Sequence, residues 1–152
     1  MKKSITTYLL IILICFQSIS AVPSGWMMFT DPSGATLGIS LEMLKNSPFP
    51  NFLVPGMFLF IFLGLFPILI VYGLIKKPKF KWAERINLFK NQHWAWTFSY
   101  YLGVLLILWI NMQLLLLKEY FFLQVVYSML GILLIFLTHL PSTKKDYGTQ
   151  NK

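Results

Sequence analysis

The chain has 152 residues, of which 57% are hydrophobic and only 12% are charged, and its mean hydropathy is +0.66. A soluble domain carries about 25% charged residues, so this composition excludes an ordinary soluble domain and indicates a protein that lies in a bilayer. The formal net charge of +8 could attract nucleic acid, but the basic residues flank apolar segments, so we expect no nucleic-acid partner. The length predicts a single membrane domain over residues 1–152.

The first apolar run, residues 5–22, is long enough to cross a membrane. Its flanks, MKKS and SISA, also suit a secretory signal peptide that is removed from the mature protein. We favour a retained helix, because the run exceeds a usual signal core and Ile19 occupies a position where cleavage after Ala21 prefers a small residue. Both alternatives remain open at this stage. Cys15, the only cysteine, lies in this run and is predicted to be a buried apolar residue.

Residues 23–55 are predicted to form a structured extracytoplasmic loop. Its DPSG stretch is typical of a turn, with Asp31 first and Gly34 last, and its flanks allow either a small hairpin or a bent loop. The following SLEMLKN stretch predicts one or two helical turns, with Ser40 as N-cap and Glu42 in the first turn. The loop is rich in Met, Phe and Leu, so we expect it to fold onto the helix ends. It would serve as a structural cap or as a lid, with Asp31 and Glu42 as candidate lid residues.

Three further apolar runs are long enough to span a bilayer as helices: residues 56–75, 96–117 and 120–140. None alternates like a barrel strand, so the sequence predicts an all-α membrane protein, a bundle of four transmembrane helices. Pro67 should kink the second helix and free a backbone carbonyl. A basic loop over 76–95 and a tail over 141–152 complete the chain.

The basic residues predict how the chain is threaded through the membrane. Eleven of the thirteen lie before the first span, between the second and third, or after the fourth. Because cytoplasmic segments are enriched in Lys and Arg, both termini and the loop 76–95 are expected in the cytoplasm of a multi-pass cell-membrane protein. Tryptophans and phenylalanines are interleaved with the basic residues of this loop, a mixture typical of lipid headgroup contact. His93 is expected to be interfacial and partly solvated.

Polar residues near the end of the third and fourth spans form a candidate pocket. Lys118 and Glu119 provide almost the whole connection between these spans, so the two helices should be antiparallel neighbours. Gln113 and Gln124 then lie at one depth, each five residues from the turn. The simplest explanation is that such amides join the two helices; the functional alternative is a polar pocket open to the extracytoplasmic side. The candidate pocket residues are Trp109, Asn111, Gln113, Gln124, Tyr127 and Ser128.

The loop motif DPSG…LG…SPF…PG, followed by WAWTFSYYLGVLLILWINMQ, resembles a group of small bacterial integral membrane proteins with four predicted helices and no assigned function. This group is distantly similar to the DoxX-like four-helix membrane proteins. The resemblance covers most of the chain and implies only a four-helix membrane bundle. It implies no redox role, because the chain lacks a cysteine pair, a haem ligand pair and a flavin motif.

Three functions compete at this stage. The first is a non-enzymatic module that binds a lipid, a small lipophile or a partner helix, including a second copy of the chain. The second is a membrane-embedded enzyme or redox-associated subunit, for which Asp31, Glu42 or Glu119 would supply the acid or base. The third is a transporter, which would need an oligomer. We expect no catalytic residues, no metal and no cofactor, since no His, Cys and acid cluster is visible in the sequence.

Overall fold

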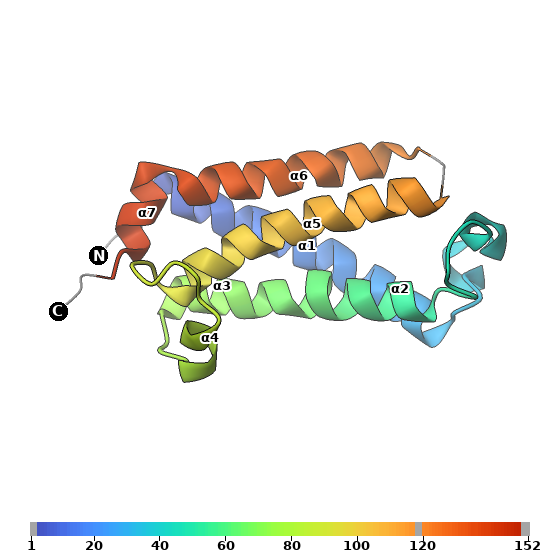
Figure 1. The fold of residues 1–152 in the computed structure, drawn as a ribbon, viewed down its shortest axis with the longest axis horizontal. Helices are drawn as coiled ribbons and strands as arrows, with labels where there is room; N and C mark the ends of the chain where they lie inside the picture. The colour runs from blue at the N-terminus through green and yellow to red at the C-terminus, as the bar shows by residue number, and fades with distance from the viewer. Residues whose placement is uncertain (1–2, 118–119, 150–152) are drawn as a thin grey trace.

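The computed structural model describes residues 3–117 and 120–149, and this part of the chain is all-α. Four helices are long and apolar enough to cross a membrane, which confirms the predicted fold class and a multi-pass protein in contact with the lipid bilayer. Figure 1 shows these helices extended along the long axis of the molecule. They are α1 (Ile5–Thr30), a composite segment (Leu53–Lys76), α5 (Trp94–Leu117) and α6 (Phe122–His139).

Helix α1 is longer than the sequence pattern predicts. The expected end at Val22 is wrong, because the helix continues through Pro23 for roughly two more turns, so the loop expected over 23–55 begins later. A proline inside a helix removes one backbone hydrogen bond, which membrane helices tolerate where neighbours pack closely. The stretch before DPSG is therefore helical, and the small hairpin considered from the sequence does not form.

Close packing against the second membrane-spanning segment holds this extension in helical form. A Cβ at Gly25 would lie 2.5 Å from the backbone nitrogen of Phe60, and one at Gly56 would lie 2.5 Å from the Cβ of Met28. Only glycine lets two helices approach this closely. The extension therefore depends on a contact between segments far apart in the sequence.

The second membrane-spanning segment consists of α2 (Leu53–Phe58), a π-helical stretch η3 (Leu59–Leu65) and α3 (Phe66–Lys76). Pro67 has no N–H to donate to the carbonyl of Leu63, so this carbonyl needs another donor. Side chains of α1 supply donors here: Gln17 Nε2 lies 3.3 Å from the Leu63 oxygen, and Ser18 Oγ lies 2.8 Å from the Gly64 oxygen. Polar groups of α1 thus compensate for the irregular backbone of its neighbour.

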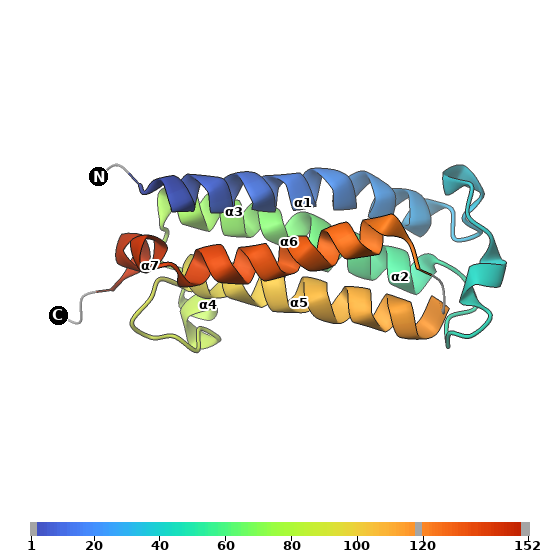
Figure 2. The ribbon, with the colours of Figure 1, turned by 90° about the horizontal axis from the view of Figure 1, so that it is seen from above.

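Helices α5 and α6 form an antiparallel pair (Figures 1 and 2). A Cβ at Gly103 would lie 2.7 Å from Cγ1 of Ile135, and one at Gly131 would lie 2.8 Å from Cγ1 of Ile107. The two glycines therefore let the helices meet, as their positions in the sequence suggest. The predicted turn at 118–119 lies outside the described residues.

Short elements gather at the two ends of the bundle. They are η1 (Ala35–Leu37), η2 (Leu41–Leu44), α4 (Lys81–Arg85) and α7 (Pro141–Tyr147). We call residues 31–52, which include η1 and η2, the cap. In Figures 1 and 2 the cap lies at one end of the bundle, and α4, α7 and both chain ends lie at the other, which we call the basic end.

The most tightly packed part of the core lies toward the basic end. Trp94, Trp96, Phe98 and Tyr147 are each at most 1% exposed. Their rings belong to a chain of aromatic contacts that includes the stacked pair of Phe80 and Trp94, with centroids 5.4 Å apart. Large rings bury much apolar surface, so this end has a dense and rigid core.

Candidate functional site

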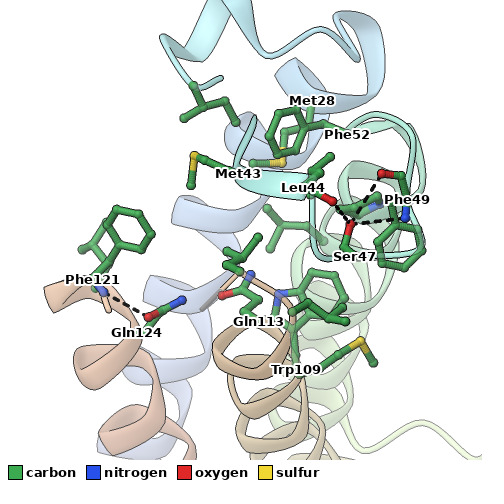
Figure 3. Close-up of a pocket in the computed structure, with 17 residues that line it drawn as sticks. Met28, Met43, Leu44, Ser47, Phe49, Phe52, Trp109, Gln113, Phe121 and Gln124 are labelled. Atoms are coloured by element: carbon green, nitrogen blue, oxygen red, sulfur yellow. Dashed lines mark hydrogen bonds between the residues drawn. The ribbon is translucent and has the colours of Figure 1, made fainter. Parts of the chain in front are cut away.

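A cavity of about 290 Å³ lies between the cap and the nearest ends of α5 and α6 (Figure 3). Small-molecule sites occupy roughly 300–1,000 Å³, so this cavity, which we call the cap cavity, lies at the lower end of that range. Its walls are almost entirely apolar. On the cap side they include Ile39, Met43, Leu44 and Phe52, and on the helix side Met112, Leu116 and Phe121.

A second cavity of about 210 Å³ lies between α1, α5 and α6, and we call it the polar cavity. Gln17, Ser20 and Ser24 of α1 line it together with Gln113, Gln124 and Tyr127 of the other two helices. The two cavities share a wall. The residues that line both are Leu59, Trp109, Gln113, Leu123 and Gln124.

Four of the six candidate pocket residues line at least one cavity. Trp109, Gln113 and Gln124 line both, and Tyr127 lines the polar cavity. Asn111 does not: its side chain is exposed and its Nδ2 donates to the carbonyl of Ile107 at 2.8 Å. Ser128 is half-buried and lines neither cavity. The antiparallel register of α5 and α6 brings Gln113 and Gln124 to neighbouring levels, as the count from the turn suggests.

The two candidate lid residues line neither cavity. The Asp31 carboxylate accepts hydrogen bonds from Ser33 and Thr36, which lower its pKa to about 2, so it stabilises the DPSG turn. Glu42 is exposed, and its backbone N–H donates to the Ser40 hydroxyl at 3.2 Å, the predicted N-cap. Apart from Ser47, the cap residues that line the cavity are apolar, and Met43 is the nearest of them in sequence to Glu42.

One amide in the shared wall has a fixed orientation. Gln124 is 5% exposed, and its Oε1 accepts the backbone N–H of Phe121 at 3.0 Å, which caps the start of α6. Figure 3 shows this bond and the amide nitrogen of Gln124 directed away from Phe121, toward the side of Gln113. Within the described chain no hydrogen bond joins the side chains of Gln113 and Gln124, so they do not simply tie the two helices together.

The residues of α1 in the polar cavity are ones that the sequence reasoning missed. Gln17, Ser20 and Ser24 lie three and four positions apart and share one helix face, a polar stripe within an apolar run. That spacing could have indicated an interior face, but it does not reveal which helix it meets. Gln17 is 2% exposed, and in the described chain its Oε1 has no hydrogen-bond partner. The polar cavity therefore contains an unpaired amide in its wall.

At the basic end, hydrogen bonds of the C-terminal helix join segments far apart in the sequence. Asp146 Oδ2 accepts from the Ser4 backbone N–H at 2.8 Å and from the Ser4 and Thr7 hydroxyls at 2.7 Å each. Partial burial raises the pKa of Asp146, but these hydrogen bonds and the charge of Lys77 outweigh that effect and lower the pKa overall. The hydroxyl of Tyr147 donates to the Leu74 carbonyl at 2.7 Å. The C-terminal helix thus fastens the start of α1 to the end of α3.

His93 also belongs to the basic end, and it is buried rather than partly solvated as expected, with 8% exposed. Its Nδ1 accepts the Ala95 backbone N–H at 3.2 Å, so its Nε2 carries the proton that faces the Pro78 carbonyl at 3.1 Å. Burial lowers the pKa of His93. This neutral histidine begins helix α5 and has a structural role.

The described residues that line the two cavities are suited to binding an uncharged molecule. Neither cavity has a charged side chain among its described lining residues. Nor does the described part of the chain bring together three or more His, Cys, Asp or Glu side chains that could hold a metal ion. An uncharged molecule with an apolar body and a small polar group fits this lining.

No family model, no curated protein and no solved structure matches this chain. The resemblance to DoxX-like proteins therefore has no support from these comparisons.

Proposed function

We propose that this chain is a non-enzymatic membrane protein that binds a small lipophile in the cap cavity, with the cap as its lid. The observation that carries the proposal is a cavity of about 290 Å³ that is closed by an apolar cap on one side and by bilayer-spanning helices on the other. A lipophile dissolved in the membrane is concentrated beside such a site. Burial of its apolar surface supplies the binding free energy.

The contacts that attach the cap to the helices support the proposal that the cap acts as a lid. The hydrogen bonds of the cap in the described chain stay within residues 27–56. The one between the residues farthest apart in the sequence joins the Phe52 N–H to the Pro32 carbonyl at 3.0 Å. Apolar residues such as Leu44 and Phe52, 6% and 4% exposed, hold the cap in place. Apolar contacts are non-directional, and in the described chain the cap has no hydrogen bonds to α5 or α6, so it can move away from these helices without breaking any.

The positions of the carboxylates favour binding over acid–base chemistry. Among the described residues the acids are Asp31, Glu42, Glu84 and Asp146, and none of them lines either cavity. A general acid or base must lie within hydrogen-bond reach of the substrate. Glu119, the remaining acid, lies outside the described residues. The transporter alternative requires an oligomer, which a mass measurement in mild detergent would reveal.

A cavity-filling substitution tests the proposal. Native mass spectrometry of the protein purified in mild detergent measures the fraction of chains that carry a bound lipophile. We expect Leu116→Trp, which fills the cap cavity, to abolish this adduct. Leu115→Trp is the matched control, because Leu115 is 77% exposed and lines neither cavity. An adduct that survives in both variants, or that is missing from the unaltered protein, would contradict the proposal.

The proposal also includes the orientation of the chain in the membrane. The basic residues of the described loop 76–95 and of α7 lie at one end of the bundle, and the cap lies at the other (Figure 1). Cytoplasmic segments are enriched in Lys and Arg, which favours a cytoplasmic basic end and an extracytoplasmic cap. The lipophile would then enter from the outer half of the bilayer.

A further inference from the structure

The shared wall of the two cavities contains a hydrogen-bond donor that has no partner in the described part of the chain. Gln124 Oε1 must face the Phe121 N–H, since only the oxygen of an amide can accept a hydrogen bond. The Gln124 nitrogen, which carries two N–H groups, is therefore directed elsewhere, toward the side of Gln113 in Figure 3. It makes no hydrogen bond with the described part of the chain, although the side chain is 5% exposed.

The surroundings of this donor restrict what can pair with it. A donor in the wall of an apolar cavity gains a hydrogen bond from an occupant that offers an acceptor, so such an occupant is preferred over one that does not. Gln113 and Tyr127 lie on the same walls and can accept or donate. Among the described residues no charged side chain lines either cavity, so these walls supply no counter-charge to a charged headgroup. The partner is therefore a neutral acceptor attached to an apolar body.

We infer that the occupant of the cap cavity is a neutral lipophile with a carbonyl oxygen, which accepts a hydrogen bond from Gln124 Nε2 while the apolar body fills the space below Met43 and Phe52. This inference rests on the proposed function and specifies its ligand class. A lipid ester and a quinone share this chemistry, because both join an uncharged carbonyl to an apolar body.

Matched photoreactive probes test this inference. The first pair is a monoacylglycerol ester and the monoalkylglycerol ether of equal chain length, both with a diazirine in the chain. The second pair is an alkyl naphthoquinone and the alkyl naphthalene without carbonyls, with the same diazirine. Each probe is added to the full-length protein in nanodiscs, and labelled peptides from the cap and from α5 are quantified by mass spectrometry.

We expect at least one carbonyl probe to label these peptides about threefold to tenfold more than its partner, the range for one neutral hydrogen bond. A preference in the first pair identifies a lipid ester, and one in the second pair identifies a quinone. The Gln124→Met variant should bring the ratio close to one. The control Asn111→Leu removes an exposed amide outside the cavities and should keep the ratio of the unaltered protein.

The outcomes separate the two proposals. Equal labelling by both members of each pair in the unaltered protein overturns the carbonyl inference but supports a lipophile in the cavity. Absence of label from the cap and α5 peptides with all four probes overturns the inference and the proposed function together. Because Gln124→Met also removes the acceptor for the Phe121 N–H, the ratio between two probes on one protein is the measurement, and it does not depend on the yield of folded variant.

Discussion

The basic end and the cap end of the bundle are built by different interactions. At the basic end, hydrogen bonds join segments far apart in the chain: Ser4 and Thr7 to Asp146, Tyr147 to Leu74, and Trp96 to Thr138 at 2.7 Å. At the cap end, hydrogen bonds stay local and apolar contacts attach the cap to the helices. The cap cavity and the polar cavity both lie toward the cap end.

This difference indicates how a small membrane bundle can hold its shape and still admit a ligand. Directional bonds at one end fix the relative positions of the chain termini and the middle loop. Non-directional contacts at the other end leave room for an occupant and for movement of the cap. Buried amide oxygens without a partner in the described chain occur in both parts of the molecule, at Gln17 beside the polar cavity and at Gln92 at the basic end, and only the first adjoins a cavity.

Cysteine labelling gives the largest expected contrast between the two ends. In a Cys15→Ser background, Ala35→Cys in the cap should react completely with a membrane-impermeant maleimide added to intact cells. Asn91→Cys at the basic end should react only after permeabilisation. Both positions are exposed, so accessibility to the reagent depends on the side of the membrane. Labelling of both in intact cells would contradict their placement on opposite sides.

The next effect comes from overpacking the basic end. A Cβ at Gly73 would overlap the ring of Trp94 and lie 2.8 Å from the Cβ of Ala95, so Gly73→Ala should lower the free energy of unfolding by about 1–3 kcal/mol or more. The control is Gly38→Ala in the cap, where nothing lies within 4 Å and only the positive φ of 66° is unfavourable, at about 1 kcal/mol. Titration of both variants with denaturing detergent, monitored by circular dichroism, gives the comparison. An equal loss would show that the basic end is not the more rigid.

Removal of the Asp146 carboxylate should have a smaller effect. Asp146→Ala leaves three donors of Ser4 and Thr7 without their acceptor and should cost about 1–3 kcal/mol of unfolding free energy. Asp31→Ala removes a carboxylate from an exposed turn and should leave the unfolding of the bundle unchanged. The same detergent titration measures both. If Asp31→Ala proves the more damaging, the cap contributes more to the stability of the bundle than its contacts indicate.

The smallest effect is the pH dependence that His93 gives to the basic end. Its pKa in the folded protein lies below the usual 6.5, so the fold favours the neutral ring. The stability that this provides is complete above pH 6.5 and is lost as the pH falls below 6.5 toward the folded value. Protonation also removes the acceptor for the Ala95 N–H. Unfolding measured between pH 5 and pH 8 should show this decline, and His93→Gln should reduce it; an unchanged slope in the variant would assign the decline to other groups.

The sequence left open whether residues 1–21 are a retained helix or a cleaved signal peptide. Ile19 and the length of the run favoured a retained helix, and α1 contributes Leu10 and Ile14, both 0% exposed, to the core. Hydropathy alone does not distinguish a signal peptide from a spanning helix, because both are apolar runs. Packing of one face against three other helices is the additional information that the structure supplies.

The candidate site was predicted only in part for a related reason. The positions of Gln113 and Gln124 relative to a short turn placed them near one level, since depth along a helix follows from counting residues. Whether a side chain faces a cavity depends on rotation about the helix axis, which counting does not provide. Asn111 therefore lies outside both cavities, while Gln17 on a distant segment lines one.

What the sequence determined by itself is what depends on local composition: four apolar spans, a basic side and a turn-rich cap of Met, Phe and Leu. A span in a bilayer must satisfy its own backbone, so length and hydropathy are sufficient to find it. Only the tertiary structure decided that α1 continues through Pro23 and that Gln124 places a donor with no partner among the described residues in a cavity wall. Both features result from the close approach of segments far apart in the chain. Gly25 meets Phe60 in the first case, and the cap meets α5 in the second. Such contacts depend on packing between segments and not on the local sequence pattern.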